Sequence, residues 1–317
     1  MTATADQISA DAPRDRGDGR GGYILELDDV GKSYGNVHAL RGVNIRVRQG
    51  EVTCVLGDNG AGKSTLIKII AGLHQHTDGV MRVEGEETVF GSPREAQGRG
   101  IATVYQDLAL APLMSVWRNF FLGNEIKKGF GLNVEEMKRI AGEELSKMGI
   151  VIPDLDRPVG ALSGGQRQVI AIARAVYFGA KVVILDEPTA ALGVKQSGVV
   201  LKYIVKMRDA GLGVIFITHN PHHAYLVGNH FVILKLGRVV LDAHRDELTL
   251  DQLTAEMAGG QELEELSHEL RGVDAGKVVE ASDGSSRGTV GAAVDVEELE
   301  PETSDVADPS AETDRKA

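Results

Sequence analysis

The sequence predicts an α/β fold in which a mostly parallel sheet carries a few antiparallel strands. Two observations support this prediction. Apolar runs rich in β-branched residues lie at 101–105, 182–185 and 214–218, a composition expected for strands buried on both faces of a parallel sheet. A further apolar run at 51–56 leads directly into a glycine-rich loop and a helix that begins near Lys63. Strands that alternate with helices in this way are typical of a wound sheet.

Shorter strands flank this core in the sequence. The runs 23–29, 43–47 and 80–84 surround the glycine-rich loop and its helix, and we expect them to form an antiparallel side sheet. Near the other end, the runs 231–235 and 238–242 are separated by Leu-Gly and predict a hairpin that ends the compact region.

A helical insertion is predicted between the strand at 101–105 and the next core strand. Asn133 and Glu136 resemble an N-cap and its partner. The residues that follow with helical spacing are Met137, Ile140, Ala141, Glu144, Leu145 and Met148. We interpret this apolar face as packing against a neighbouring helix rather than as a ligand site.

Charge is concentrated at the end of the chain. The 317 residues carry a formal net charge of −12, and residues 261–317 alone hold 16 acidic and 5 basic side chains. The remainder is close to neutral, which argues against a polyanion-binding surface and therefore against a nucleic-acid partner. The acidic tail at 261–317 has almost no aromatic residues and is expected to be largely disordered, with an acidic docking or regulatory tail as the alternative. The polar segment 1–22 is expected to be a disordered arm.

The sequence has one cysteine and no long apolar run. Cys54 lies within the strand at 51–56 and is expected to be a small buried packing residue rather than a nucleophile. No stretch approaches the roughly 20 apolar residues that span a bilayer. We therefore expect any membrane association to pass through a partner protein.

The glycine-rich loop is the first motif with a defined chemistry. It reads G-x-x-x-x-G-K-S, a pattern whose backbone N–H groups surround phosphate oxygens at the start of a helix. Lys63 is expected to reach the β- and γ-phosphates of a nucleoside triphosphate, Ser64 to hold Mg²⁺, and Thr65 to lie near the α- and β-phosphates. A glycine-rich turn without a ligand is the alternative. The predicted nucleotide-binding residues of the motif are Gly57, Asp58, Asn59, Gly60, Ala61, Gly62, Lys63, Ser64 and Thr65.

The apolar strand at 182–185 ends in two acids. Asp186 and Glu187 follow it directly, at the sheet edge where the phosphate loop is expected. Asp186 can hold Mg²⁺ through its coordinated water, and Glu187 can polarise the water that attacks the γ-phosphate. An acidic cap on a surface turn is the alternative.

A pentapeptide at 162–166, LSGGQ, stands at the start of a predicted helix and supplies a second anion-binding site. Together with the phosphate loop, the acidic strand end, Gln106 and His219, it resembles the ATP-binding-cassette family over roughly 23–260. The resemblance implies a P-loop NTPase core with a mostly parallel sheet, an antiparallel β subdomain, and a helical subdomain at about 107–175 that carries the pentapeptide. The nucleotide-binding residues implied there are Ser163, Gly164, Gly165 and Gln166.

The same resemblance implies a shared nucleotide site. In the family, ATP on one subunit's phosphate loop is completed by the LSGGQ helix of a second subunit, in a head-to-tail dimer. Because this chain carries one set of motifs, an ATP-dependent homodimer is the default expectation, and pairing with a sister cassette is the alternative.

Three further positions acquire roles from the resemblance. Tyr34 looks like the aromatic that stacks on adenine, with a packed ring as the alternative. Gln106 looks like the glutamine that touches Mg²⁺ and the attacking water, so it is predicted as both a catalytic and a metal-site residue. His219 resembles the histidine that bonds the γ-phosphate and holds Glu187. The predicted catalytic set is Glu187, His219, Gln106 and Lys63, and Tyr34 is predicted as a nucleotide-binding residue. The neighbouring His222 and His223 are interpreted as helix-surface residues.

One position departs from the family pattern. Where the family usually has an aspartate that contacts the opposite subunit, this chain has Gly193. The departure puts communication across the dimer in doubt, but it removes neither Glu187 nor either phosphate-binding element.

Two segments, at 104–123 and 218–225, look like the bacterial monosaccharide-uptake branch of the family, in which ribose, xylose and fructose transporters lie. The implied function is ATP hydrolysis that powers sugar uptake through a membrane permease, with an extracytoplasmic sugar-binding protein as an indirect partner. The implied location is the cytoplasmic face of the inner membrane. An exporter ATPase and a catalytically weak regulatory cassette are the alternatives, and the sequence does not identify the sugar.

Overall fold

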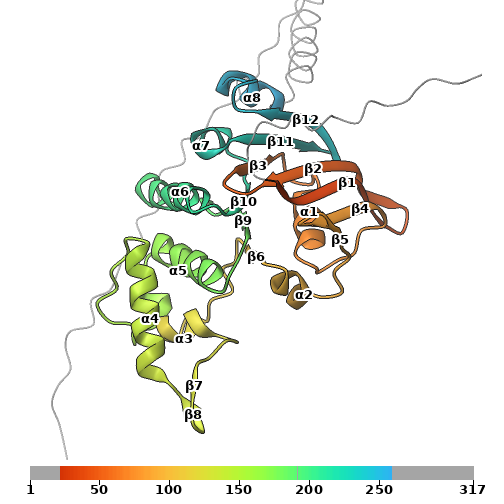
Figure 1. Ribbon diagram of the computed structural model, residues 1–317. Helices are drawn as coiled ribbons and strands as arrows, with labels where there is room; N and C mark the ends of the chain where they lie inside the picture. Colours follow the sequence, from red (N-terminus) through yellow and green to blue (C-terminus); the bar gives the residue numbers. More distant parts are fainter. Residues whose placement is uncertain (1–21, 191, 259–317) are drawn as a thin grey trace, which may run out of the picture. The chain divides into compact units, whose positions relative to one another are not determined.

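The computed structural model describes residues 22–190 and 192–258. The predicted arm at 1–22, apart from its last residue, and the predicted acidic tail at 261–317 lie outside the described residues. Two large sheets, a small two-stranded hairpin and the helices around them form the described part (Figure 1).

The core sheet has six strands, five of them parallel. In spatial order they are β12 (Arg238–His244), β11 (His230–Lys235), β3 (Val52–Leu56), β10 (Gly213–Ile217), β9 (Val182–Asp186) and β6 (Ile101–Val104). Only β12 runs antiparallel, as the second strand of the hairpin with β11. The prediction of a mostly parallel sheet with antiparallel additions is confirmed.

The side sheet is antiparallel, with the order β2-β1-β4-β5. Its strands are β1 (Tyr23–Tyr34), β2 (Val37–Arg48), β4 (Asp78–Val83) and β5 (Glu86–Glu87). The predicted side sheet is therefore confirmed, although β1 and β2 run longer than the sequence indicated. The polar stretch at 30–34 continues to pair with β2 through several register shifts, so the hairpin closes only at the turn of residues 35 and 36.

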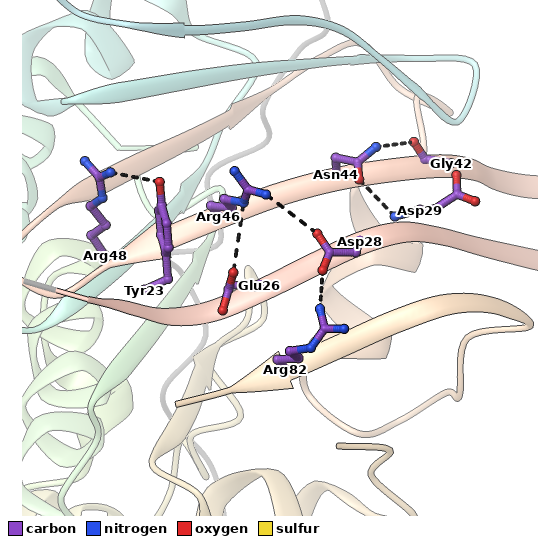
Figure 2. A network of polar contacts seen from close by, with 9 residues as sticks. All are labelled: Tyr23, Glu26, Asp28, Asp29, Gly42, Asn44, Arg46, Arg48 and Arg82. Atoms are coloured by element: carbon purple, nitrogen blue, oxygen red, sulfur yellow. Dashed lines mark hydrogen bonds and ion pairs between the residues drawn. The ribbon is translucent and has the colours of Figure 1, made fainter. Parts of the chain in front are cut away.

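Charged side chains of β1, β2 and β4 form a network of polar contacts on this sheet (Figure 2). Arg46 of β2 reaches Glu26 and Asp28 of β1 at 4.0 Å each, and Arg82 of β4 bonds the other oxygen of Asp28. Arg48 donates to the Tyr23 hydroxyl at 2.8 Å. Exposed pairs of this kind are worth about 0–1 kcal/mol each. Their contribution is to match the strand register rather than to drive folding.

Alternating side chains of the core strands face two different layers. Val52, Cys54 and Leu56 of β3 pack toward α6 (Val194–Asp209), α7 (Pro221–Val227) and α8 (Leu250–Met257). Val55, between them, packs toward α1 (Lys63–Ile70) and the side sheet. Figure 1 shows these helices and the side sheet on opposite sides of the core strands. This burial on both faces explains why the core strands are apolar throughout.

Cys54 is fully buried, as predicted, with its Sγ 3.6 Å from the Ala224 carbonyl oxygen. Burial raises the pKa of its thiol far above the usual range, because the apolar surroundings disfavour the thiolate. The side chain is therefore an inert packing group.

A helical region forms its own apolar cluster. The short helix α2 (Pro93–Gly98) lies outside this region, because its Ala96 packs in the same cluster as the side sheet. The elements of the helical region are α3 (Val116–Phe121), the small hairpin of β7 (Lys127–Lys128) and β8 (Gly131–Leu132), α4 (Val134–Lys147), the short 3-10 helix at Val159–Ala161 and α5 (Gly164–Tyr177). Of these, α3, α4 and α5 share one core, in which Met137, Ala141 and Leu145 of α4 are buried. The predicted packing of that face is confirmed, and the Asn133 side chain accepts from the Glu136 N–H as an N-cap.

The compact fold continues past the β11–β12 hairpin. The helix α8 begins at a capping box in which Thr249 and Gln252 bond each other's backbone, and its Leu253 is fully buried. The expectation that the hairpin ends the compact region was therefore wrong. Within residues 22–190 and 192–258, no helix combines the length and apolarity needed to cross a bilayer.

Candidate functional site

The phosphate loop connects the end of β3 to the start of α1. Gly57 and Gly62 adopt φ of 143° and 110°, which side chains rarely tolerate. A Cβ on Gly57 would stand 2.3 Å from the Leu234 carbonyl oxygen, and one on Gly62 would stand 2.7 Å from Leu40. Both glycines are thus required by the close approach of neighbouring strands, and this fixes the path of the loop.

Lys63 is buried at the first position of α1. Its ammonium donates to the Gly57 carbonyl at 2.5 Å and to the Asp58 carbonyl at 3.0 Å. No side chain caps this helix, so its first N–H groups are available to an anion. The loop therefore presents a cation and helix-end amides together.

A hollow of about 870 Å³ opens in front of the loop, and we call it the phosphate-loop hollow. It brings together three predicted elements: the loop, Gln106 after β6, and the acids after β9. The predicted residues that line it are Asp58, Asn59, Gly60, Gly62, Lys63, Ser64, Thr65, Gln106, Asp186 and Glu187. Gly57 and Ala61 are not among its lining residues, and both are buried in the protein.

Asp186 is a half-buried carboxyl at the end of β9. Burial raises its pKa above the usual range, the neighbouring Glu187 raises it further, and Lys63 acts in the opposite direction. A divalent cation bound here would offset both the desolvation of Asp186 and its repulsion by Glu187, so the position favours such an ion.

Glu187 has a left-handed backbone, with φ of 48°. This conformation costs a residue with a Cβ about 1–2 kcal/mol. The residue is held there by its N–H, which donates to the Ile217 carbonyl at 3.0 Å. Backbone strain of this kind occurs where the surrounding structure fixes a functional side chain.

The two carboxylate oxygens of Glu187 differ. Oε1 lies 3.0 Å from Nδ1 of His219, which follows β10 and is itself exposed. An ionised carboxylate accepts only, so His219 donates this bond. Oε2 is buried and has no hydrogen-bond partner among the described residues. A buried acceptor left open beside Lys63 and Asp186 suits a water molecule or a metal-bound water.

Tyr34, at the end of β1, does not line the phosphate-loop hollow. Its ring is 44% exposed and meets the His74 ring edge-on at a centroid distance of 5.7 Å, with Lys32 Nζ 5.1 Å from its centre. The ring is therefore not a packed core residue, and much of its surface is accessible.

The pentapeptide helix is built separately. Ser163 caps α5 in a capping box with Gln166, at 3.3 Å and 3.0 Å. Gly164 and Gly165 lie against Leu192 and Gln196, so that a Cβ would stand 2.9 Å and 3.3 Å away. Ser163, Gly165 and Gln166 line another hollow of about 410 Å³. Within one chain the structure does not bring residues 163–166 to the phosphate-loop hollow.

Sequence reasoning missed two contributors. The turn at Leu236 and Gly237 lines the phosphate-loop hollow, and the Gly237 N–H donates to Ala61 of the loop at 2.9 Å while its carbonyl accepts from the Arg41 N–H at 2.8 Å. The second is His223, which is half-buried and bonds Thr189, so the interpretation as a surface residue holds for His222 alone. The glycine at position 237 indicated a turn in the sequence. Its contact with Ala61 joins segments that are distant in sequence, so it could be found only in the folded structure.

Comparison with known proteins places this geometry in a family. Residues 40–190 match the family model described as ABC transporter. The chain is 44% identical over 234 residues to a xylose/arabinose import ATP-binding protein of Sulfolobus acidocaldarius, covering 74% of this chain and 93% of that protein. A fructose import ATP-binding protein of Rhizobium meliloti is 43% identical over 247 residues, with 75% and 95% covered. A ribose import ATP-binding protein of Bacillus subtilis is 35% identical, but the match covers only 48% of its length.

Solved structures agree. A nucleotide-free ATP-binding cassette from an ABC transporter matches with a TM-score of 0.66 and 25% identity, over 75% of this chain and 96% of that one. A dimeric bacterial ABC transporter cassette matches with a TM-score of 0.60 and 27% identity, over 70% and 99%. The chain therefore belongs to the ABC transporter family.

Proposed function

We propose that this cassette powers the import of a monosaccharide by hydrolysing ATP in sites shared by two copies of the chain. The observation that carries the proposal is the convergence of Lys63, Asp186 and Glu187 on one hollow, with one Glu187 oxygen held by His219 and the other open. The residues fit a triphosphate and an attacking water.

Each side chain has a part in this chemistry. Lys63 and the first amides of α1 bind the β- and γ-phosphates. Ser64, Asp186 and Gln106 all line the hollow and offer the oxygen ligands that Mg²⁺ prefers, so they would hold that ion. The ion would neutralise charge on the phosphates. Glu187 orients and polarises water, while His219 fixes Glu187 and contacts the γ-phosphate. Tyr34 stacks on the base.

The dimer follows from the separation of the two phosphate-binding elements. At the start of α5, Ser163 is exposed, Gly164 and Gln166 are half-buried, and Gly165 is buried. None of them lines the phosphate-loop hollow. A second copy, placed head to tail, would bring them over the nucleotide as two symmetric sites. ATP then stabilises the closed pair, and hydrolysis releases it.

Membrane coupling requires a groove for the permease. A groove between α2 and α5 is lined in part by Tyr105, Leu108, Arg174 and Phe178. Its lining residue Tyr105 directly precedes Gln106 in the sequence. A cytoplasmic helix of a permease placed there would connect the ATP site to transport. Two relatives matched over nearly their whole length are named for xylose/arabinose and fructose import, which supports a monosaccharide as the cargo. An extracytoplasmic sugar-binding protein that delivers the cargo is part of the same proposal.

The first test removes the charge of Glu187. In the purified protein, Glu187→Gln is expected to lower ATP turnover by about 100-fold or more, because a positioned base contributes that much. ATP binding persists, so an ATP-bound dimer accumulates and is detected by light scattering. The matched control is Glu87→Gln on the exposed strand β5.

Unchanged turnover in Glu187→Gln, or only single molecules at saturating Mg-ATP, would refute the assignment. Cargo and direction are tested by co-reconstituting the chain with its permease in vesicles. Sugars are then screened with the binding protein for stimulated ATP turnover and inward movement. Stimulation with outward movement would indicate the exporter alternative.

A further inference from the structure

A second histidine reaches the segment that follows Glu187. His223 lies on α7, and its Nδ1 is 3.0 Å from the hydroxyl oxygen of Thr189, two residues after Glu187. Thr189 is buried, with 7% of its surface exposed. The pair joins residues 34 positions apart in sequence. It runs beside the contact between His219 and Glu187, so residues 219 and 223 hold the same turn at two points.

The turn itself is short and tightly bonded. The Ala190 N–H donates to the Glu187 carbonyl at 3.0 Å, and the Glu187 N–H donates to Ile217 at 3.0 Å. Glu187 adopts its left-handed conformation at the first position of this turn. A conformation of that kind persists only where neighbours constrain it. The hydroxyl of Thr189 adds a side-chain contact that holds the turn through α7.

The helix α7 that carries His223 is held in place by its N-cap and by buried side chains. Asn220 caps α7 by accepting from the His223 N–H at 3.1 Å, and Asn220 in turn donates to Thr218 at 3.1 Å. Ala224 and Val227 of the same helix are buried against the core. The helix therefore sets the place of the ring, and the ring sets the place of the loop hydroxyl.

We propose that His223 is a positioning residue for ATP hydrolysis, which holds Thr189 and thereby the carboxylate of Glu187 in its reactive place. The inference rests on the proposed role of Glu187. His223 does not line the phosphate-loop hollow, so it acts on the rate of the chemical step through the turn and leaves nucleotide binding to the phosphate loop.

The bond does not depend on one protonation state. A neutral imidazole accepts from the Thr189 O–H through Nδ1, and a protonated one donates to its oxygen. The burial of His223, followed by the charge of the adjacent His222, lowers the pKa of the ring, which favours the accepting form at neutral pH.

The test is a double-mutant cycle on steady-state ATP turnover by the full chain. His223→Ala and Thr189→Val each remove one partner, and Thr189→Val keeps the shape of the side chain. Each single change is expected to lower kcat by about 10-fold, which corresponds to about 1.4 kcal/mol in the barrier. KM for ATP stays within about twofold, because the phosphate loop is unchanged. The double variant is no slower than the worse single variant, since both changes remove the same bond.

Two conservative changes distinguish positioning from general damage to the fold. His223→Asn keeps a hydrogen-bonding group near the Nδ1 position, and Thr189→Ser keeps the hydroxyl, so both are expected to recover most of kcat. The neighbouring exposed His222→Ala serves as the control and leaves kcat within about twofold. Thermal midpoints are measured for every variant.

Three outcomes would each overturn the inference. The first is an unchanged kcat in both single variants, and the second is additive losses of kcat in the double variant. The third is a rise in KM for ATP that alone explains the slower turnover. The proposed function fails separately. If wild-type turnover persists in Glu187→Gln, the role of Glu187 is wrong, whereas loss of turnover there combined with neutral His223 and Thr189 variants rejects the positioning role alone.

Discussion

At the scale of single residues, the site holds groups that are unfavourable for folding and useful for chemistry. Asp186 keeps a raised pKa because it is half-buried beside Glu187. Glu187 keeps a strained backbone and a buried carboxylate oxygen without a partner among the described residues. Natural proteins tolerate such costs at functional sites and offset them through the rest of the fold.

Asp186→Asn is expected to separate stability from activity. The raised pKa means that the folded state disfavours the charged carboxylate. The resulting loss of stability is absent below the pKa of the unfolded chain, grows as pH rises towards the raised folded-state pKa, and is complete above it. Without Mg²⁺ at pH 8, the amide should therefore raise the thermal midpoint by about 1–3 °C. The gain shrinks as pH falls through the raised pKa towards the ordinary range of an aspartate. ATP turnover should be nearly abolished.

Calorimetry at several pH values, with turnover assays beside it, checks this expectation. Asp107→Asn, at an exposed position one residue after Gln106, is the matched control and should change neither quantity appreciably. A lower midpoint for Asp186→Asn at every pH would show that the carboxylate stabilises the fold and would contradict the argument.

At the scale of elements, the turn between β11 and β12 lies against the glycine-rich loop and lines the phosphate-loop hollow. Gly237 has φ of 78°, and a Cβ there would stand 2.6 Å from the Ala39 carbonyl oxygen. Its N–H supports Ala61 within the loop. The β11–β12 hairpin belongs to the core sheet, and its turn is hydrogen-bonded to the loop. A segment remote in sequence therefore lines the hollow.

Gly237→Ala is expected to destabilise the protein by about 3 kcal/mol and to raise KM for ATP severalfold. The left-handed conformation alone accounts for about 1–2 kcal/mol, and the clash with strand β2 adds the remainder and displaces the loop. Gly211→Ala is the control, because Gly211 has φ of 87° with no atom within 4 Å of the added Cβ. Urea unfolding and ATP titration of both variants give the comparison. Equal effects of the two changes would exclude a special role for the turn.

The elements also show what a sequence reveals and what it conceals. The buried strands β3, β9 and β10 were predictable because their apolar composition reflects burial on two faces. The end of β1 was not, because Lys32 and Ser33 pair through bulges that leave no alternating pattern. Local motifs likewise predicted Lys63, Asp186 and Glu187, whereas the contacts of Thr189 with His223 and of Ala61 with Gly237 join distant segments and needed the fold.

At the scale of the whole molecule, Gly193 bears on communication between copies. The residue stands at the N-cap of α6 with φ of −68°, and the nearest atom to an added Cβ is a Gln196 side-chain oxygen at 3.8 Å. The position therefore has room for the aspartate that the family usually carries. The Gln196 side chain accepts from the Gly193 N–H and also packs against Gly165, so this segment adjoins the pentapeptide helix.

Gly193→Asp should leave stability nearly unchanged or raise it by a few tenths of a kcal/mol, since aspartate is a good N-cap. If the carboxylate contacts the opposite subunit, the ATP dependence of turnover becomes more cooperative, with a higher Hill coefficient. Gly193→Asn fits the same space without charge and provides the control. An aspartate variant with the same Hill coefficient as both wild type and the asparagine variant would show that this position does not link the two sites.

The buried thiol of Cys54 has a practical consequence. It is the only cysteine in the sequence, it is completely enclosed, and its ionisation is strongly suppressed. The wild-type protein is therefore expected not to react with maleimide dyes. A thiol introduced at any exposed position would be modified selectively, so opening and closing of the assembly could be followed by fluorescence without first redesigning the protein.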